Sequence, residues 1–306
     1  MRLFDLHCDT LFETLKHNGD ILRNDGHVDL ARGMRFSPWY QCFAVWVRDG
    51  VADEQAKREV SRMLQKASAF EKQYPTLFHI HTKQAEWFSM PLTPVTGILT
   101  VENGGVAAGG DDFPDDWVRA GIKMVSLTWN GANRWAQGCD GDPKKGLTAS
   151  GRAAVRKMEQ HGIVIDAAHL NRRGFWDVCQ LTSRPFAVSH TASAAVFPSV
   201  RGLNDMQFCE VKRRGGIVGL DLCAEHLGGL SVERFVAHLE HFLSLGGKQT
   251  VALGCDFDGI DLPPQYEGIR MLTRLYDRLL QRNYAECLID DLFFDNAYRF
   301  FKRHSR

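Results

Sequence analysis

Six acidic or imidazole side chains each stand at or just beyond the end of a short apolar run in this sequence. Runs of this length and composition are typical of buried strands. The carboxyl ends of parallel strands meet at one mouth of a closed barrel, so side chains that follow different strands come together there. The pattern therefore predicts an α/β barrel with a polar site at its mouth. The six residues are His7, Asp9, Glu102, His169, His190 and Asp256.

The order of apolar runs and amphipathic stretches predicts a (β/α)8 TIM barrel. Strands that alternate with helices form a parallel sheet, and eight such units close it into a barrel. Predicted strands lie at about 2–6, 41–47, 97–101, 122–127, 163–167, 185–189, 216–221 and 250–255. Predicted helices lie at 51–73, 150–161, 231–245, 266–282 and 285–302. A chain of 306 residues without a linker-like tract suits one barrel domain over residues 1–306, with an irregular excursion at the proline-bearing segment 74–96.

Charge and cysteine content narrow the classes of partner and compartment. The 37 basic and 37 acidic residues give zero formal net charge, which disfavours a nucleic-acid partner or an anionic membrane surface. No apolar run is long enough to span a membrane. The eight cysteines are scattered without a C-x-x-C pair, and the chain opens on a predicted strand instead of a basic, apolar leader. We therefore expect a reduced, cytoplasmic protein.

His7 and Asp9 form a His-x-Asp pair at the end of the first predicted strand. Side chains alternate between the two faces of a strand, so residues two apart share a face and can bind one cation. The pair taken alone is equally compatible with a turn that caps the next helix. Three further candidate ligands at separate strand ends make a metal site the stronger interpretation. These are Glu102, His169 and His190.

The five candidate ligands indicate which metal is bound and how many ions. Three imidazoles with one Asp and one Glu suit zinc, and they tolerate manganese, cobalt or iron. Five side chains exceed what one tetrahedral catalytic zinc uses, but they suit two ions that share a carboxylate. Glu102 is the expected bridge, with His7 and Asp9 on one ion, while His169 and His190 bind the other. Two ions about 3.5–4 Å apart can hold a hydroxide between them and polarise a substrate carbonyl, which predicts metal-assisted hydrolysis.

Two charged residues outside the ligand set are expected to act on the substrate. Asp256 closes the last predicted strand, where its carboxylate can take a proton from the attacking water and pass it to the leaving group. Asp258 beside Gly259 fits a turn cap better, so Asp256 is the predicted base. Arg201 follows the strand of His190, and an arginine close to two cations needs an anion. A substrate carboxylate, bound bidentately, is the expected anion.

The ordered series of motifs resembles the membrane (renal) dipeptidase family, peptidase family M19 of the amidohydrolase-like barrels. The similarity covers nearly the whole chain, through Val-Glu-Asn-Gly, Ile-Asp-Ala-Ala-His, Val-Ser-His-Thr-Ala-Ser, Arg-Gly-Leu-Asn-Asp and Gly-Cys-Asp-Phe-Asp-Gly. The resemblance implies a dipeptidase with two zinc ions per chain, in which Arg201 binds the free carboxylate of a dipeptide. It also implies a homodimer, as in many members, and a cytoplasmic enzyme like the soluble bacterial ones.

One departure from the family pattern concerns the oxyanion. The family usually has Leu-Thr-His where this chain has Leu127-Thr128-Trp129, so Trp129 replaces the histidine that is thought to donate to the oxyanion. The indole N–H of Trp129, or the amide of Asn130 or Asn133, can donate in its place. If none of them does, the loss of one oxyanion donor lowers the rate on the order of 10²–10³-fold.

A second departure lies in the segment 218–223, where the family often reads Asn-Phe-Tyr. Cys223 stands where the resemblance places a tyrosine that helps to hold the substrate carboxylate. Asp221 is more acidic than the family's asparagine. It either caps a helix, which is the interpretation we favour, or accepts a cationic group of the substrate. The predicted substrate contacts are Arg201, Trp129, Asn133 and Cys223.

Two pairs of histidines resemble functional sites less well. His79-Ile-His81 has the His-x-His spacing of other metal sites, but it lies in the irregular segment, so we expect a surface or edge strand. His238 and His241 share a helix face without an acidic partner, so we expect them to be exposed to solvent.

Three functions are consistent with these residues. The leading one is dipeptide hydrolysis, with Asp256 moving the proton and Arg201 binding the terminal carboxylate. The second retains the metals but acts on another small amide or ester, because Trp129 and Cys223 alter the pocket. The third is a catalytically silent metal-binding relative, which the retention of Asp256 and Arg201 disfavours.

Overall fold

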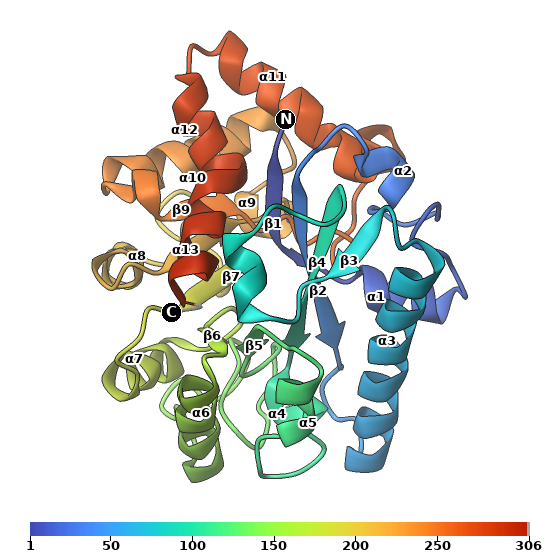
Figure 1. Cartoon of the computed structure of the whole chain (residues 1–306). Helices are drawn as coiled ribbons and strands as arrows, with labels where there is room; N and C mark the ends of the chain where they lie inside the picture. Colours follow the sequence, from blue (N-terminus) through green and yellow to red (C-terminus); the bar gives the residue numbers. More distant parts are fainter. Residues whose placement is uncertain (305–306) are drawn as a thin grey trace.

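Eight parallel strands close into a barrel in the computed structural model, which describes residues 1–304 except the side chain of Gln84 (Figure 1). Every strand predicted from the sequence is present, and the pairing of β4 with β2 closes the ring. The predicted (β/α)8 TIM barrel is therefore confirmed. The barrel strands are β1 (Leu3–Cys8), β2 (Trp39–Trp46), β4 (Val95–Glu102), β5 (Met124–Ser126), β6 (Val164–Asp166), β7 (Ala187–Thr191), β8 (Ile217–Leu220) and β9 (Val251–Leu253).

A ninth strand, β3 (Phe78–Ile80), lies outside the ring and pairs with the first residues of β4. It occupies the segment predicted to be irregular, and a short 3-10 helix follows it at Gln84–Phe88. His79 therefore lies on an edge strand, as expected. His81 is buried at 2% exposure, because it packs against Trp87 with the ring centroids 4.1 Å apart.

Helices fill the connections between the strands (Figure 1). The predicted helices 51–73, 150–161 and 231–245 are confirmed as α3, α6 and α10. Polar side chains begin several of them, as where Thr148 and Ser231 each accept a hydrogen bond from a first-turn N–H. The helices are α1 (Thr10–Lys16), α2 (Leu30–Gly33), α3 (Asp53–Gln73), α4 (Gly104–Ala107), α5 (Asp115–Arg119), α6 (Ala149–His161), α7 (Arg172–Leu181), α8 (Asp205–Arg213), α9 (Ala224–Leu227), α10 (Val232–Ser244), α11 (Met271–Gln281), α12 (Glu286–Asp290) and α13 (Asn296–His304).

Two predicted helices differ from the structure. The stretch 266–282 is α-helical only from Met271, because Glu267 has left-handed backbone angles that no α-helix accommodates. The stretch 285–302 is divided into α12 and α13 by a π-helical turn at Asp291–Asp295. Phe294 of this turn packs into the apolar cluster under the barrel, while Leu292 and Phe293 pack into the main core, and this packing overrides the helical periodicity of the sequence.

The prediction that His238 is exposed is wrong. Its side chain is fully buried between α10 and the loop that follows β7, where Nδ1 accepts the backbone N–H of Ser193. The other ring nitrogen lies 3.2 Å from the carbonyl oxygen of Leu227, to which it donates. His238 thereby ties α9 to the barrel. His241, on the same helix, pairs with Asp205 near the surface.

The interior of the barrel is apolar at the amino-terminal end of the strands. All eight barrel strands contribute to one buried cluster there, beginning with Phe4 and Leu6 of β1. Trp87 and the apolar face of α13, including Phe301, complete the cluster and close this end of the barrel. Figure 1 shows α13 to the left of β1, and this helix contacts β1, β8 and β9. We call this cluster the floor.

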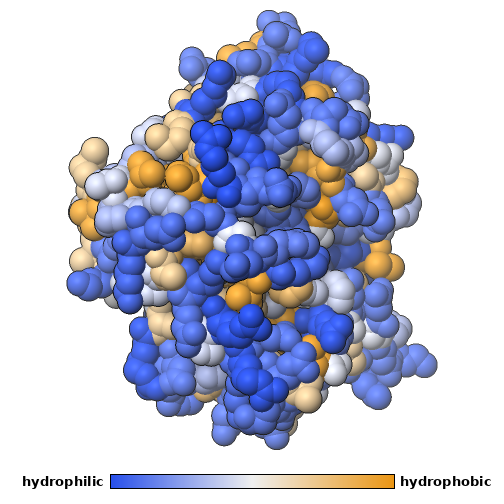
Figure 2. Space-filling model, turned by 90° about the vertical axis from the view of Figure 1, so that its right-hand side faces the viewer, coloured by the Kyte–Doolittle hydropathy of each residue, from blue (hydrophilic) through white to orange (hydrophobic). Residues whose placement is uncertain are grey.

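The described part of the chain contains no helix that is long and apolar enough to cross a membrane. Polar side chains cover most of the face that Figure 2 shows, and apolar atoms occur there only in small scattered groups.

Candidate active site

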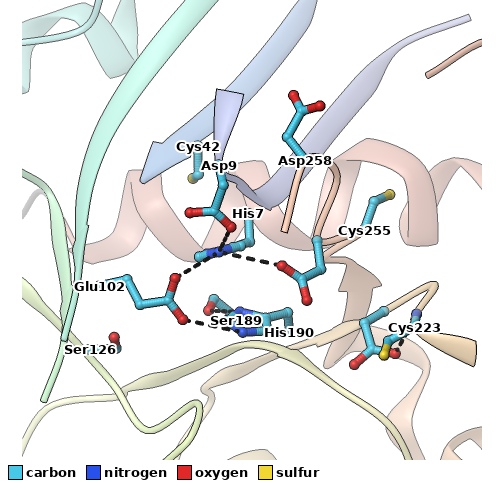
Figure 3. A network of polar contacts seen from close by, with 12 residues as sticks. His7, Asp9, Cys42, Glu102, Ser126, Ser189, His190, Cys223, Cys255 and Asp258 are labelled. Atoms are coloured by element: carbon cyan, nitrogen blue, oxygen red, sulfur yellow. Dashed lines mark hydrogen bonds and ion pairs between the residues drawn. The ribbon is translucent and has the colours of Figure 1, made fainter. Parts of the chain in front are cut away.

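The six side chains singled out from the sequence come together at the mouth of the barrel, opposite the floor. Figure 3 shows four of them, His7, Asp9, Glu102 and His190. They project from the carboxyl ends of five different strands: two from β1 and one each from or just after β4, β6, β7 and β9. Each of them is at most 8% exposed to solvent. The site is therefore a buried cluster of charge and imidazole, which is stable only with compensating partners.

Irregular pairing turns two of the histidines into the barrel. Phe4 and Leu6 already face the interior, so strict alternation would direct His7 outward. The register between β1 and β2 shifts between Asp5 and Cys8, at the position of His7. A bulge of this kind re-aims a side chain, and a similar shift brackets His190 in β7.

The two carboxylate oxygens of Glu102 face different histidines. Oε2 lies 3.3 Å from Nε2 of His7, while Oε1 lies 2.7 Å from Nε2 of His169 and 3.7 Å from Nε2 of His190. Asp9 joins the first side, with Oδ2 3.3 Å from Nε2 of His7. Glu102 thus stands between two groups of candidate ligands.

Neighbouring side chains fix which nitrogen two of the histidines turn toward the site. Ser189 donates its hydroxyl to Asp166 at 2.5 Å, so it accepts from Nδ1 of His190 at 2.9 Å. Nδ1 of His169 donates to Oδ1, the side-chain amide oxygen of Asn130, at 2.7 Å. Hydrogen bonds of this kind orient metal-binding imidazoles and leave Nε2 with a free lone pair.

These residues fit a bound cation. With both Nδ1 atoms protonated, Nε2 of His169 and Nε2 of His190 face each other at 2.7 Å without a proton between them. Oδ1 of Asp9 is buried and has no hydrogen-bond partner among the described residues. Both arrangements are unfavourable unless a positive charge lies between the ligands. Two triads can hold an ion with ligand atoms within 4.8 Å of one another: His7, Glu102 and His190, and His7, Asp9 and Asp256.

Burial and mutual charge set the protonation of the cluster. Burial lowers the pKa of His169 to about 3, with help from the charge of Arg201, so its imidazole is neutral. Burial, followed by the positive charge of His7, also holds the pKa of His190 well below its usual value. Neutral imidazole is the form that binds metals. Burial raises the pKa of Asp9 to about 6 despite the nearby His7, so this carboxylate gains from a cation beside it.

Several backbone positions at the mouth adopt left-handed angles. Asn103, His169 and Asp256 have φ values of 63°, 62° and 60°. Such angles are uncommon outside glycine and cluster at functional sites, where the surrounding structure enforces them. Here they follow the ends of β4, β6 and β9, and they position the ligand or acid at each strand end.

Asp256 lies beside the ligand cluster, with Oδ1 3.7 Å from Nε2 of His7. Burial, outweighing the attraction of His7, raises its pKa well above the usual value for a carboxyl group. A carboxylate with a raised proton affinity suits a group that takes and returns a proton. Asp258 serves structure instead, since it accepts hydrogen bonds at 2.5 Å from the hydroxyl of Thr10 and from the N–H of His27.

Arg201 is nine-tenths buried beside the cluster and has no carboxylate partner among the described residues. One guanidinium nitrogen donates to the carbonyl oxygen of His190 at 3.2 Å, while its Nε is buried and has no hydrogen-bond partner in the described part of the chain. A buried guanidinium without a counterion is costly, so this geometry favours an anionic ligand.

A cavity of about 480 Å³ opens above these residues. Three of the residues proposed from the sequence as substrate contacts, Arg201, Cys223 and Trp129, line it. Phe12 and Trp46 extend Trp129 into an aromatic wall, with successive ring centroids 4.7 Å and 5.2 Å apart. The cavity therefore combines a polar base with an aromatic side, an arrangement typical of small-molecule sites.

Asn133 does not line the cavity, contrary to its predicted role. Its amide nitrogen donates to Asn103 and to the carbonyl of Leu127, both at 2.8 Å. Its oxygen accepts the N–H groups of Trp135 and Ala136. Both ends of the Asn133 amide therefore hold this loop in place. Asn130, instead of Asn133, lines the cavity.

Several residues that shape the site are not indicated directly by any sequence pattern. Ser189 precedes His190, and a hydroxyl beside a candidate ligand is a signal that could have indicated an orienting residue. Asp166 belongs to the Ile-Asp-Ala-Ala-His motif, but the motif does not indicate that it accepts the hydroxyl of Ser189. His226 lines the cavity five residues after Asp221, a spacing that places no two side chains on one helix face, so no pattern marked it.

Comparison with known proteins agrees with this geometry. Residues 1–305 match the model of the membrane dipeptidase family, peptidase family M19. A metallo peptidase from Rhodobacter sphaeroides, solved with a phosphinate mimic of the dipeptide L-Ala-D-Ala, is 26% identical with a TM-score of 0.87, covering 99% of both chains. The dipeptidase AC, a metallo peptidase of family M19, is 27% identical with a TM-score of 0.88, covering 99% of this chain and 98% of that one.

A protein of Schizosaccharomyces pombe, described as an uncharacterized dipeptidase, is 24% identical over 308 residues, covering 95% of this chain and 74% of that protein. The family match spans almost every residue that contributes to the barrel and its mouth. The chain therefore belongs to the membrane dipeptidase family, peptidase family M19, and is a metal-dependent enzyme of the dipeptidase type.

Proposed function

We propose that this protein hydrolyses the peptide bond of dipeptides with the help of two zinc ions bound at the barrel mouth. The observation that carries the proposal is the position of Glu102, whose two oxygens face separate groups of ligands. A carboxylate placed in this way suits a bridge between two cations, and the mixed nitrogen and oxygen ligands suit zinc.

Five side chains would hold the two ions. His7 and Asp9 lie on one side of Glu102, and His169 and His190 on the other. When bound, the pair supplies Lewis-acid chemistry that acidifies the attacking water and polarises the peptide carbonyl. The hydrogen bonds from His169 to Asn130 and from His190 to Ser189 keep the two imidazoles oriented for this role.

Asp256 moves the proton in this proposal. Its carboxylate accepts a proton as the water oxygen bonds to the peptide carbonyl carbon. It returns the proton to the amine nitrogen as the carbon–nitrogen bond breaks, so the products are two free amino acids. Burial favours the protonated form of Asp256, which helps it to hold the proton between the two steps.

Arg201 restricts the substrate to molecules that carry a carboxylate next to the scissile bond. Its buried, unpaired Nε and its remaining donors match a carboxylate, and the free carboxyl terminus of a dipeptide supplies one. The aromatic wall of Phe12, Trp46 and Trp129 then faces the remaining space of the cavity. The similar Rhodobacter sphaeroides protein was solved with a dipeptide mimic, which supports this substrate class.

The test joins metal analysis to a dipeptide panel. We expect about two zinc ions per chain, cleavage of dipeptides, and no cleavage of dipeptide amides that lack the carboxylate. The panel includes both stereoisomers of each residue, N-acylated amino acids and lactones. In Asp256→Asn, we expect kcat to fall about 10²–10⁴-fold while both ions remain bound.

Two results would contradict the proposal. Cleavage of N-acylated amino acids or lactones without cleavage of any dipeptide would assign the site to another amide or ester. Stoichiometric zinc without turnover of any amide would indicate a silent metal-binding relative.

A further inference from the structure

A protonated histidine faces the cavity on the side of β8. His226 lies in α9, lines the cavity, and its Nδ1 is 2.6 Å from Oδ2 of Asp221. Asp221 is fully buried and also accepts the N–H of Cys223. Burial of His226 opposes its charge, but the hydrogen bond and charge of Asp221 outweigh it and raise the pKa of His226 to about 10.

The position of His226 is fixed by the surrounding structure. His238 donates to the carbonyl oxygen of Leu227, the last residue of α9, and accepts the N–H of Ser193 in the loop after β7. Leu227 itself is fully buried. The short helix is therefore tied to the barrel from behind, and His226 is held at the cavity wall.

The imidazolium has a second N–H donor besides the one bonded to Asp221. The thiol of Cys223, a weak acceptor, is its other hydrogen-bonding neighbour, and no oxygen of the described residues accepts this N–H. With Nδ1 bonded to Asp221, the remaining donor is Nε2, and the side chain is 13% exposed on the cavity side. A protonated imidazole donates from both nitrogens and accepts from neither. A ligand group that meets Nε2 must therefore be an acceptor, and a carboxylate gives the strongest hydrogen bond.

Arg201 and His226 belong to neighbouring parts of the wall. Arg201 follows β7 and His226 follows β8, and these two strands are paired. Among the described residues that line the cavity, these two carry positive charge, whereas the imidazole of His169 is neutral. When Arg201 holds the terminal carboxylate of a dipeptide, the side chain of that same residue branches one carbon away, within reach of the adjacent wall.

We propose that His226 binds a carboxylate in the side chain of the substrate's second residue, so that the preferred dipeptides end in aspartate or glutamate. The inference rests on the proposed dipeptidase function and specifies its substrate class. Asp221 acts through His226 as a positioning residue. The exposed Glu225 next to His226 has no hydrogen bond to it in the described structure and leaves Nε2 available.

The experiment compares acidic dipeptides with their uncharged isosteres. The first residue is kept constant, and the second is Asp against Asn or Glu against Gln, in both stereochemical forms. For the wild-type enzyme loaded with zinc, we expect kcat/KM to be about 10- to 100-fold higher for the acidic member of each pair. This ratio reports on charge recognition and is insensitive to the amount of active enzyme.

His226→Gln keeps a hydrogen-bonding side chain but removes the charge, and we expect the ratio to fall to about one. Asp221→Asn is expected to reduce the ratio as well, because it removes the group that keeps His226 protonated. His241→Gln is the matched control, since His241 lies on α10 and pairs with Asp205 instead of lining the cavity. The control should retain the wild-type ratio.

The outcomes separate this inference from the function on which it rests. Cleavage of the Asn and Gln dipeptides with a wild-type ratio near one would overturn the role of His226 and leave the dipeptidase function intact. A high ratio that persists in His226→Gln would also overturn it, because another group would then recognise the acid. Failure to cleave any dipeptide would overturn the proposed function itself.

Discussion

The mouth and the floor of the barrel are built from the same eight strands but in opposite ways. The floor is an apolar cluster in which Phe4 stacks on Tyr40 and Phe301, each with ring centroids 5.4 Å apart. The mouth buries carboxylates and imidazoles, and Oδ1 of Asp9 has no hydrogen-bond partner there among the described residues. Left-handed backbone angles occur at the mouth at Asn103, His169 and Asp256.

The difference indicates that the floor mainly stabilises the fold and that the mouth carries the activity. Close-packed aromatic rings contribute favourable free energy at the floor without needing any ligand. Buried charge and strained backbone at the mouth are unfavourable by themselves and become favourable only with bound ions and substrate. Changes at the two ends should therefore be separable by experiment.

The largest effect is expected at the mouth, for Glu102→Gln. The amide removes the charge that two cations would share and supplies only one good acceptor. We expect bound zinc to fall from about two ions to one or fewer, and kcat/KM for dipeptides to fall at least about 10³-fold. Metal analysis and steady-state kinetics on the same preparation provide the check. Unchanged metal content would contradict the bridging position of Glu102.

At the floor, Phe4→Ala should have the opposite effect, because it should lower stability and leave activity nearly unchanged. Removing this fully buried ring should lower the free energy of unfolding by about 3–5 kcal/mol. The kcat of the folded, zinc-loaded enzyme should stay within about twofold of the wild type. Urea unfolding followed by circular dichroism measures the first quantity, and Phe4→Leu is the milder control. A large loss of kcat in folded protein would show that the two ends are coupled.

The smallest expected effect is a difference in protonation between two histidines, one near each end of the barrel. Burial, assisted by Lys123, lowers the pKa of His81 to about 4 although Glu86 opposes the shift, whereas Asp221 raises the pKa of His226 to about 10. NMR titration of the imidazoles between pH 6 and 8 should therefore show His81 neutral and His226 protonated throughout. Titration of His226 near pH 6.5 would contradict its ion pair with Asp221.

These pKa values have opposite consequences for stability. The contribution of His226 is complete below its unfolded pKa of about 6.5 and is lost as the pH rises through about 10, at about 1.4 kcal/mol per pH unit. The contribution of His81 is complete above pH 6.5 and is lost as the pH falls toward about 4. Asp221→Asn should flatten the alkaline part of the stability profile.

Much of the fold and the metal cluster could be predicted from the sequence, because strand patterns are local and short motifs mark strand ends. All eight barrel strands and the joining of the six mouth residues follow from such patterns. Asn133 and His238 could not be placed in the same way. Asn133 bonds to the side chain of Asn103 and to backbone groups of its own loop, while His238 bonds to Ser193 and Leu227 in other segments. A sequence pattern does not show which groups form these hydrogen bonds.

The sequence by itself determined the barrel, the order of its units and the residue types that meet at its mouth. The tertiary structure decided which way those residues point. His7 and His190 lie at shifts in strand register, without which simple alternation would turn them away from the cavity. The tertiary structure also brought His226 against Asp221 and beside Arg201, since a cavity wall is assembled from loops that follow separate strands. Alternation is a property of one strand, whereas register and enclosure depend on how the strands pair.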